Sequence, residues 1–448
     1  MTAISRLSEF VVGARPPAEA RARAAIAFLD TVGVTLAGAS EPASRIVQAV
    51  VASEGGDACR VFGTTTRASA SGAALANGTA AHALDYDDMC FVSLAHPSAP
   101  LVPAALAAGE LEGSTGCGVL DAYVVGFEIE ARLGRLMNPR HYQRGWHCTA
   151  TLGTIGATAA VSRLLRLNAN AASQALAIAA SEASGLKENF GTMVKPLHAG
   201  LAARNGIHAG LLAKGGMTAS PLALDGPQGF LHAMDGEQLA LADAVRDLGQ
   251  RWEVLETGIT VKLYPSCAGT HPALDAILEL RRREGIGADE VERIEIDVDS
   301  ITPTILIYER PTSGLEGKFS MPFCVAAAVA FGRVDLETFD APTLSNALVT
   351  GLMGRVVMRV DPSLDGIGEP LTQARASVRL KDGRAFTQPA NGARGYPAQP
   401  ATDAELEAKF LACARRTLPE ESCAAALEML RGIEQIKDVR RLTDALAF

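Results

Sequence analysis

The segment TATLGTIGATAAVSRLL, residues 149–165, shows the pattern that decides the fold of this chain. Small side chains recur three or four residues apart, at Gly153, Gly156, Ala157 and Ala160. This spacing places them along one side of a helix, and small residues there let two helix backbones approach closely. The segment therefore predicts a buried helix that packs tightly against its neighbours.

Similar helical patterns run through most of the N-terminal half. Apolar and small residues at helical spacing predict further helices over 20–36, 69–83, 97–111, 119–136, 170–183 and 197–212. A large bundle of buried helices that extends to about Trp252 accounts for all of these segments.

The pattern changes in the C-terminal half. Alternating and β-branched residues predict strands over 291–300 and 354–361, and an apolar run predicts a helix over 321–331. Asp382 and Gly383, between two alternating runs, predict a β-hairpin over 374–388. This part of the chain is therefore expected to be a smaller α+β unit.

Helical pattern then returns near the C-terminus. Thr402 with Glu405 predicts a capping box at the start of a helix, and the tail over 403–423 is amphipathic. We therefore expect a mainly α fold whose large helical domain is built from both chain ends, with an inserted α+β lid domain. The expected domains are residues 1–258 and 396–448 for the helical domain and 259–395 for the lid. A cleft between two such domains is a common place for a small-molecule site.

Composition and charge exclude several classes of protein. Hydrophobic residues make up 48% and charged residues 20%, which fits a soluble globular enzyme rather than a disordered chain. The net charge of -9 argues against a nucleic-acid binder, because such proteins need a basic face. The eight cysteines include no C-x-x-C pair, so reduced thiols and a cytoplasmic location are expected. Neither a secretory signal nor a membrane span is predicted.

Four segments carry polar residues that a helix core does not require. The first, residues 81–100, holds three carboxylates and two histidines: Asp85, Asp87, Asp88, His82 and His96. His96 precedes Pro97, a favoured residue at the start of a helix, so an anion could meet the imidazole and free backbone N–H groups there. The alternative is a solvated acidic turn with a capping histidine.

The second segment, residues 140–153, lies next to the helix quoted above. It combines side chains suited to proton transfer and anion binding: His141, Tyr142, Arg144 and His147. Histidine is the side chain best matched to proton transfer near neutral pH. The alternative is a polar loop around a packed Trp146.

The third and fourth segments each contain a lysine near a proline-marked helix start. Lys195 precedes Pro196, and a lysine there is unfavourable for the helix dipole unless an anion lies between them. Lys262 opens residues 260–276, at the proposed domain boundary, together with Tyr264, Cys267 and His271. The alternative for the third segment is a solvated lysine, and the alternative for the fourth is an ordinary hinge loop.

Together the four segments suit one kind of chemistry. Removal of a proton from a carbon beside a carboxylate creates a dianionic intermediate, which nearby donors or cations must stabilise. Lysines bind carboxylates as compact positive charges, and a histidine can act as the base, so no metal is required. A metal bound by the three aspartates and two histidines stays open as an alternative, although no H-E-x-x-H motif supports it.

Five ordered motifs give the chain a resemblance to a known family. They read ALANGTAAHALDYDD, AHPSAP, RGWHCTATLG, MVKPLHAGLAARNG and KLYPSCAGTH. Over nearly its whole length the chain resembles the MmgE/PrpD family. The resemblance implies a helical domain from both chain ends, an inserted α+β lid and a homodimer. It also implies an enzyme that needs no metal and no organic cofactor.

The resemblance also implies roles for individual residues. His96 and His147 correspond to a proton-transfer pair, and Asp85 to a residue that orients a partner, with Tyr142 as a further candidate acid or base. Lys195 and Lys262 correspond to residues that bind carboxylates. The polar segments add Arg144, His271 and Cys267 as further residues expected to bind the substrate.

The sequence departs from the cis-aconitate decarboxylase branch of that family. Met89 stands where the branch has a threonine, Cys267 where it has a histidine and Phe323 where it has a tyrosine. One residue is also inserted between Asp85 and His96. These changes remove polar contacts from the implied pocket.

We therefore expect a cofactor-independent lyase that abstracts a proton beside a carboxylate of a small di- or tricarboxylic acid. Dehydration of a 2-methylcitrate-like hydroxy acid is the favoured outcome. Epimerisation of a dicarboxylate such as iminodisuccinate and decarboxylation of the cis-aconitate type are open alternatives. A non-catalytic protein that binds carboxylates is the alternative from another class.

Overall fold

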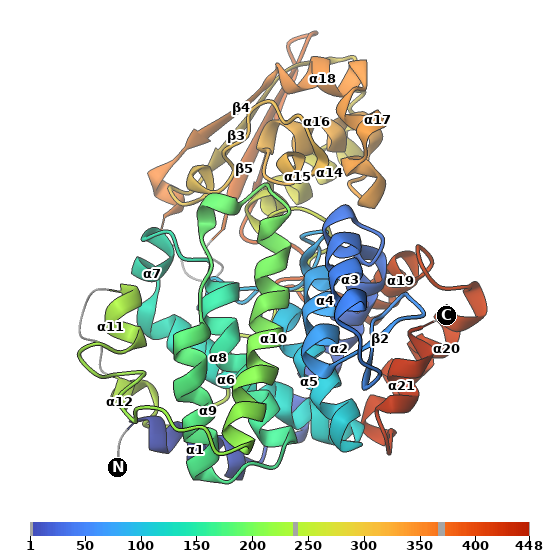
Figure 1. Ribbon diagram of the computed structural model, residues 1–448. Helices are drawn as coiled ribbons and strands as arrows, with labels where there is room; N and C mark the ends of the chain where they lie inside the picture. The colour runs from blue at the N-terminus through green and yellow to red at the C-terminus, as the bar shows by residue number, and fades with distance from the viewer. Residues whose placement is uncertain (1–2, 236–240, 366–371, 448) are drawn as a thin grey trace. The chain divides into compact units, whose positions relative to one another are not determined.

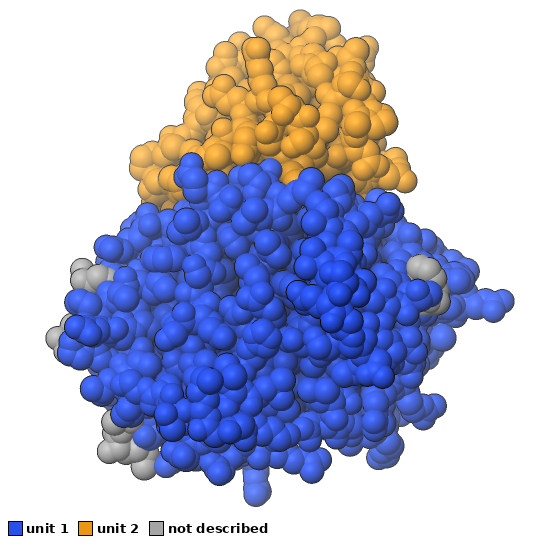
Figure 2. Space-filling model, in the orientation of Figure 1, with its two compact units in different colours: residues 1–261, 402–448 blue, residues 262–401 orange. Residues whose placement is uncertain are grey.

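The computed structural model describes residues 3–235, 241–365 and 372–447 of the chain. Helices predominate within these ranges, and a mixed four-stranded sheet lies in the C-terminal half (Figure 1). The predicted mainly α fold is therefore confirmed. Two compact units are present: unit 1 is Met1–Val261 with Thr402–Phe448, and unit 2 is Lys262–Ala401 (Figure 2).

Unit 1 is helical apart from a short hairpin, in which β1 (Cys59–Arg60) pairs antiparallel with β2 (Arg67–Ala68). Its described α-helices are α1 (Ala3–Gly13), α2 (Ala18–Gly38), α3 (Pro42–Glu54), α4 (Ala70–His82), α5 (Ser98–Glu112), α6 (Gly116–Met137), α7 (Arg140–Gln143), α8 (Cys148–Leu164), α9 (Ala169–Glu182), α10 (Val194–Lys214), α11 (Phe230–Asp235), α12 (Leu241–Ala244), α13 (Glu253–Glu256), α19 (Asp403–Ala414), α20 (Glu420–Arg431) and α21 (Arg440–Ala445).

Unit 2 combines the sheet with helices. Its described elements are α14 (His271–Glu284), β3 (Val291–Val298), α15 (Gly314–Gly317), α16 (Met321–Phe331), α17 (Ala341–Leu344), α18 (Ala347–Met353), β4 (Val356–Val360), β5 (Ala374–Leu380) and β6 (Ala385–Ala390). The strand order is β4-β3-β5-β6, with β3 and β4 parallel and the other pairs antiparallel.

The helix predicted over 149–165 is α8, and almost all of its residues are buried. Its glycines allow close contacts, as their spacing predicts. A methyl group on Gly126 of α6 would lie 2.6 Å from the carbonyl oxygen of Gly156, and one on Gly153 would lie 2.8 Å from the ring of Pro100. Only glycine fits at this separation, so α6, α8 and α5 pack almost backbone to backbone.

A similar contact joins α4 to α10. A methyl group on Gly78 would lie 2.9 Å from the Cα atom of Gly200, and one on Gly200 would overlap the side chain of Thr79. Because a methyl group fits on neither side, α4 and α10 are held at a fixed short separation. The two helices end and begin, respectively, at His82 and next to Lys195.

The C-terminal segment packs onto the N-terminal helices of the same unit, where α19 contacts α2 (Figure 1). The predicted capping box is confirmed, because Thr402 and Glu405 each hydrogen-bond the backbone of the other at the start of α19. The amphipathic tail over 403–423 is divided between two helices. The α19 helix ends at Ala414 and α20 begins after Pro419, a residue that restricts its predecessor to non-helical backbone.

The core of unit 2 lies between the sheet and its helices. Alternate residues of β3, Ile294, Ile296 and Val298, are fully buried in one cluster with side chains of α14 and α16. The hairpin predicted at Asp382 and Gly383 joins β5 to β6, and Gly383 has a φ of +91°. A positive φ of this size favours glycine, which explains the residue at this turn.

Among the described residues no single helix is long and apolar enough to cross a membrane. In the part of the chain that the structure describes, α2 and α3 taken together, which are bent by 87° relative to each other, are the one pair that reaches the required length and apolarity.

We expect Gly200→Ala to lower the stability of the protein by about 1–3 kcal/mol, because the added methyl group overpacks the contact between α4 and α10. Gly13→Ala is a matched control in unit 1, since nothing lies within 4 Å of a methyl group there. Thermal unfolding followed by circular dichroism measures both. An unchanged melting temperature for Gly200→Ala would show that the two helices can move apart.

Candidate functional site

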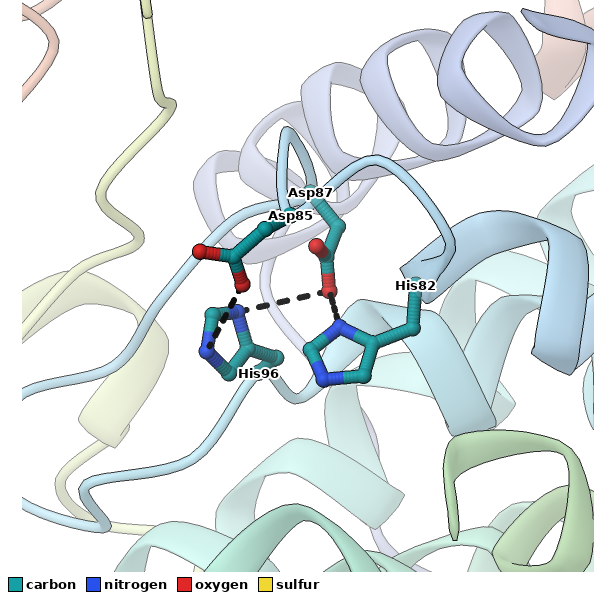
Figure 3. A group of neighbouring side chains, drawn as sticks. All are labelled: His82, Asp85, Asp87 and His96. Atoms are coloured by element: carbon teal, nitrogen blue, oxygen red, sulfur yellow. Dashed lines mark hydrogen bonds and ion pairs between the residues drawn. The ribbon is translucent and has the colours of Figure 1, made fainter. Parts of the chain in front are cut away.

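The loop 83–97, between α4 and α5, carries the first group of polar side chains. His82 is the last residue of α4, and His96 lies just before α5. The centroids of their rings are 4.5 Å apart. Nδ1 of His82 lies 2.7 Å from Oδ2 of Asp87, and Nδ1 of His96 lies 3.3 Å from the same oxygen. Nε2 of His96 lies 3.9 Å from Oδ1 of Asp85. Figure 3 shows the carboxylate of Asp87 pointing toward both rings and that of Asp85 toward His96.

The protonation of Asp87 follows from its burial and its partners. Burial by itself would raise the pKa of this carboxyl, but the imidazoles of His82 and His96 outweigh burial and hold the pKa well below 3.8. A carboxylate only accepts hydrogen bonds, so Nδ1 of His82 carries the proton that it shares with Asp87. Burial lowers the pKa of His82 to about 3 despite this carboxylate. The ring is therefore neutral near pH 7, and its Nε2 presents a lone pair.

A second pair of imidazoles lies beside the first. His147 occupies the N-cap position of α8, and its backbone N–H donates to the carbonyl of Gly185. Its ring stacks on His82 at 5.6 Å between centroids and lies 5.2 Å from the ring of His198 on α10. His96, His82, His147 and His198 therefore form a continuous row of imidazoles, which we call the histidine row.

His147 and His198 of the histidine row are neutral near pH 7. Burial, followed by the positive charges around it, lowers the pKa of His147 well below 6.5. Burial and the nearby Lys195 lower the pKa of His198 to about 4. Nδ1 of His147 lies 3.0 Å from Nδ1 of His198, so one of these two nitrogens carries the shared proton. The contact couples the protonation of the two rings: when His147 donates, its Nε2 is bare, and when His198 donates, Nε2 of His147 carries the proton.

Lys195 supplies a buried positive charge at the same place. It lies in the first turn of α10, is only 4% exposed and forms an ion pair with Oδ1 of Asp85. Its ammonium nitrogen is 5.3 Å from the centre of the Phe190 ring, whose edge-on neighbour is His147. A buried ammonium needs such a partner, because the desolvation of an unpaired charge is very costly.

Asp88 differs from the other two aspartates of its loop. Its carboxyl accepts hydrogen bonds from the backbone N–H and the hydroxyl of Ser98, and the Ser98 hydroxyl also contacts the Tyr123 hydroxyl at 2.7 Å. Burial raises the pKa of Asp88 to about 8, with the charges of Asp30 and Asp87 adding to the shift. Asp88 is therefore neutral near pH 7 and supports the loop. The sequence alone grouped it with Asp85 and Asp87.

The metal alternative also takes a definite form. One ligand atom each from His82, Asp85, Asp87 and His96 all lie within 4.8 Å of one another, and imidazoles with carboxylates are suitable ligands for zinc. However, the ammonium of Lys195 already neutralises Asp85, and a dication would compete with it. We therefore interpret the group as a charge-paired proton-transfer cluster.

The structure brings together four residues that the sequence singled out: Asp85, His96, His147 and Lys195. Two others have different surroundings. The ring of Tyr142 lies under the ammonium of Lys187, 3.5 Å from the ring centre, and Arg144 is exposed. Their predicted roles in proton transfer and substrate binding therefore gain no geometric support.

Three further residues predicted to bind the substrate belong to unit 2. Lys262 is fully buried and Cys267 is half-buried. His271 is buried, with Nε2 3.1 Å from the carbonyl oxygen of Ser266 and its ring edge-on to Tyr264. Their contribution to substrate binding stays a prediction.

The sequence-based choice of catalytic and substrate-binding residues omitted His82, Asp87 and His198, and it named the first two only as possible metal ligands. All three lie in the polar segments, but their types alone did not distinguish them from loop residues. A signal was present for His198, because it follows Lys195 by three positions and so shares its side of a helix. His82 and Asp87 lie on either side of a helix end, and helical spacing does not predict such a contact.

We expect the stability of the protein to fall as the pH rises through about 8, and to fall less in Asp88→Asn. The folded protein keeps the Asp88 proton up to about pH 8, whereas the unfolded chain releases it near 3.8. The contribution of Asp88 to stability is therefore complete at acidic pH and is lost at alkaline pH.

The check is the melting temperature of the wild type and of Asp88→Asn at pH 6 and pH 9. Glu110 and Glu128, whose pKa values burial raises to about 7, contribute equally to both. An identical decrease in both would contradict the assignment.

Comparisons with known proteins extend over nearly the whole chain. The human cis-aconitate decarboxylase is 27% identical over 84% of this chain and 79% of its own length. The cis-aconitate decarboxylase-like protein oryM of Aspergillus oryzae is 27% identical over 95% of this chain and 92% of its own. A cis-aconitate decarboxylase of Aspergillus terreus is 27% identical over 96% and 92%. The family models for the MmgE/PrpD N-terminal and C-terminal domains match residues 5–241 and 264–435. The chain therefore belongs to the MmgE/PrpD family.

Proposed function

We propose that this protein is a lyase that moves protons at a carbon beside a carboxylate group of a small polycarboxylic acid. The observation that carries the proposal is the largely buried histidine row. The ionised Asp87 lies beside His82 and His96. The ammonium of Lys195 is close to His147 and His198. This arrangement combines groups that accept a proton with a cation that attracts a carboxylate. The names of the relatives, which are decarboxylases of the tricarboxylate cis-aconitate, support the same class of substrate.

The histidine row can provide the base. Within the residues that the structure describes, the Nε2 atoms of His82 and His147 are buried and have no hydrogen-bond partner. An unsatisfied buried polar atom costs free energy, so a ligand that meets these nitrogens gains affinity. Both rings are neutral near pH 7. Nε2 of His82 is bare because Nδ1 carries the proton shared with Asp87, and Nε2 of His147 is bare when His147 donates to His198. A neutral imidazole with a bare nitrogen can take a proton from carbon.

Lys195 would hold the acid and stabilise the intermediate. An ammonium has three N–H donors, so it can contact Asp85 and a substrate carboxylate at the same time. Loss of the proton places additional negative charge on that carboxylate, and the lysine is already in position to stabilise it. The bound anion also raises the pKa of nearby imidazoles, because an opposite charge favours the protonated ring. A ring that has accepted the proton can then act as an acid.

Dehydration is the outcome that we favour. One group must take the proton from carbon while another protonates the departing hydroxyl, so that a carbon–carbon double bond and water form. His96 and His147 each lie next to the ring of His82 and come from different segments, which provides two separate proton carriers. Decarboxylation is the second candidate because the relatives carry that name. It needs one proton donor, which protonates carbon as the bond to the departing carbon dioxide breaks.

Nuclear magnetic resonance in deuterium oxide tests the proposal with 2-methylcitrate, citrate, malate and cis-aconitate as candidate acids. We expect at least one hydroxy acid to exchange the hydrogen beside its carboxylate and to form the unsaturated acid. Carbon dioxide release from cis-aconitate would favour decarboxylation. Saturable binding without exchange would instead show a non-catalytic binding protein. Activity that a chelator removes and a divalent ion restores would favour a metal centre.

Two variants separate catalysis from binding. We expect His147→Gln to lower kcat about 10²- to 10⁴-fold, the range of a general acid or base, while the acid still binds. Asp85→Asn combined with Lys195→Met leaves no unpaired buried charge, and we expect it to weaken binding of the acid. Steady-state kinetics and calorimetric titration of the acid measure the two effects. Unchanged turnover in His147→Gln would remove this residue from the mechanism.

A further inference from the structure

Lys409 of α19 is a buried cation that the proposed reaction does not use. Its side chain is 3% exposed, and its ammonium nitrogen lies 2.6 Å from Oδ1 of Asp30 on α2, whose side chain is 1% exposed. The same nitrogen donates a hydrogen bond of 2.7 Å to the carbonyl oxygen of Tyr86 and lies 4.0 Å from the centre of the Tyr86 ring. The lysine therefore joins two helices from opposite ends of the chain to the loop 83–97.

The position of Tyr86 in that loop makes this contact important. Tyr86 lies between Asp85, which pairs with Lys195, and Asp87, which contacts His82 and His96. The direction of both carboxylates depends on the peptide groups on either side of Tyr86. Asp85 has a φ of +51°, a left-handed conformation that is uncommon for residues other than glycine. Contacts from outside the loop are needed to maintain such a backbone.

The far end of the carboxylate-bearing part of the loop is also held. The backbone N–H of Met89 donates to the carbonyl of Thr260 at 2.9 Å, and the N–H of Thr260 donates back at 2.8 Å. Near the start, the N–H of Asp85 donates to the carbonyl of His82 at 3.3 Å. The hydrogen bond from Lys409 to Tyr86 lies between these two anchors, at the residue between Asp85 and Asp87.

A buried ion pair is a costly way to join two helices. The desolvation of two charges offsets most of their attraction, and apolar residues of similar size often give equal or greater stability. A leucine and a methionine could join α2 to α19, but neither could donate a hydrogen bond to the Tyr86 carbonyl. An ammonium can reach both the Asp30 carboxylate and this carbonyl because it has three donors.

We propose that Lys409, held by Asp30, is a positioning residue that fixes the Tyr86 carbonyl and thereby directs Asp85 and Asp87 toward Lys195 and the histidine row. This inference rests on the proposed function only for its consequence in catalysis; the effect on loop geometry is independent of it. The C-terminal segment thus contributes to the site without contacting the substrate.

The test compares three variants with the wild-type full chain. Lys409→Met removes the hydrogen bond but leaves Asp30 buried without its cation, so this variant alone is expected to fold poorly. Asp30→Asn combined with Lys409→Met removes both charges and is the decisive variant. Lys214→Met is the matched control, since it removes a lysine ion pair of the same length, 2.6 Å, on the exposed end of α10.

We expect the double variant to melt within a few degrees of the wild type, yet to lose about 10- to 100-fold in kcat, because small displacements of catalytic groups have effects of that size. We expect the ring signals of His82 and His96 to shift in ¹⁵N-histidine spectra recorded without any acid. The Lys214→Met control should match the wild type in all three measurements.

Two outcomes separate this inference from the proposed function. A folded double variant with wild-type histidine signals and wild-type kcat would overturn the positioning role of Lys409. Shifted histidine signals in the double variant, in a protein that converts none of the candidate acids, would support the positioning role and overturn the proposed reaction.

Discussion

The contact between α4 and α10 at Gly78 and Gly200 sets the separation on which the rest of the site depends. Because there is no room for a methyl group on either helix, the backbones cannot shift relative to each other without opening a void. One helix ends at His82, and the other begins next to Lys195 and carries His198. The close packing of these glycines therefore fixes where the imidazole groups of His82 and His198 and the ammonium group of Lys195 lie.

Burial then decides the charge state of each group. The neutral imidazoles of His82, His147 and His198 can coexist in one row because charging all of them in the interior would be unfavourable. Asp87 stays ionised through its imidazole neighbours, and Asp88, one residue later, stays protonated because it lacks them. A negatively charged ligand would raise the pKa of the imidazoles, because an anion favours the protonated ring. Proton transfer requires that these rings can gain a proton when the ligand binds.

The connectivity of unit 1 has a related consequence. Residues 402–448 complete the helical unit that the N-terminal part begins, and α19 carries Lys409 to the loop that holds Asp85 and Asp87. Segments from opposite ends of the chain therefore both contact this loop and stabilise its geometry. A small change in the packing of α19 against α2 would reach the carboxylates through the contact of Lys409 with Tyr86.

The sequence by itself determined the helices and the hairpin, since these depend on residues close together along the chain. The helix predicted over 97–111 is Ser98–Glu112, and the hairpin at Asp382 and Gly383 is present. The motifs also identified Asp85, His96, His147 and Lys195 as candidates. Only the tertiary structure decided that His147 shares a proton with His198, that Asp88 is neutral and that Lys409 reaches Tyr86. These features depend on burial and on contacts between distant segments, and local spacing contains neither.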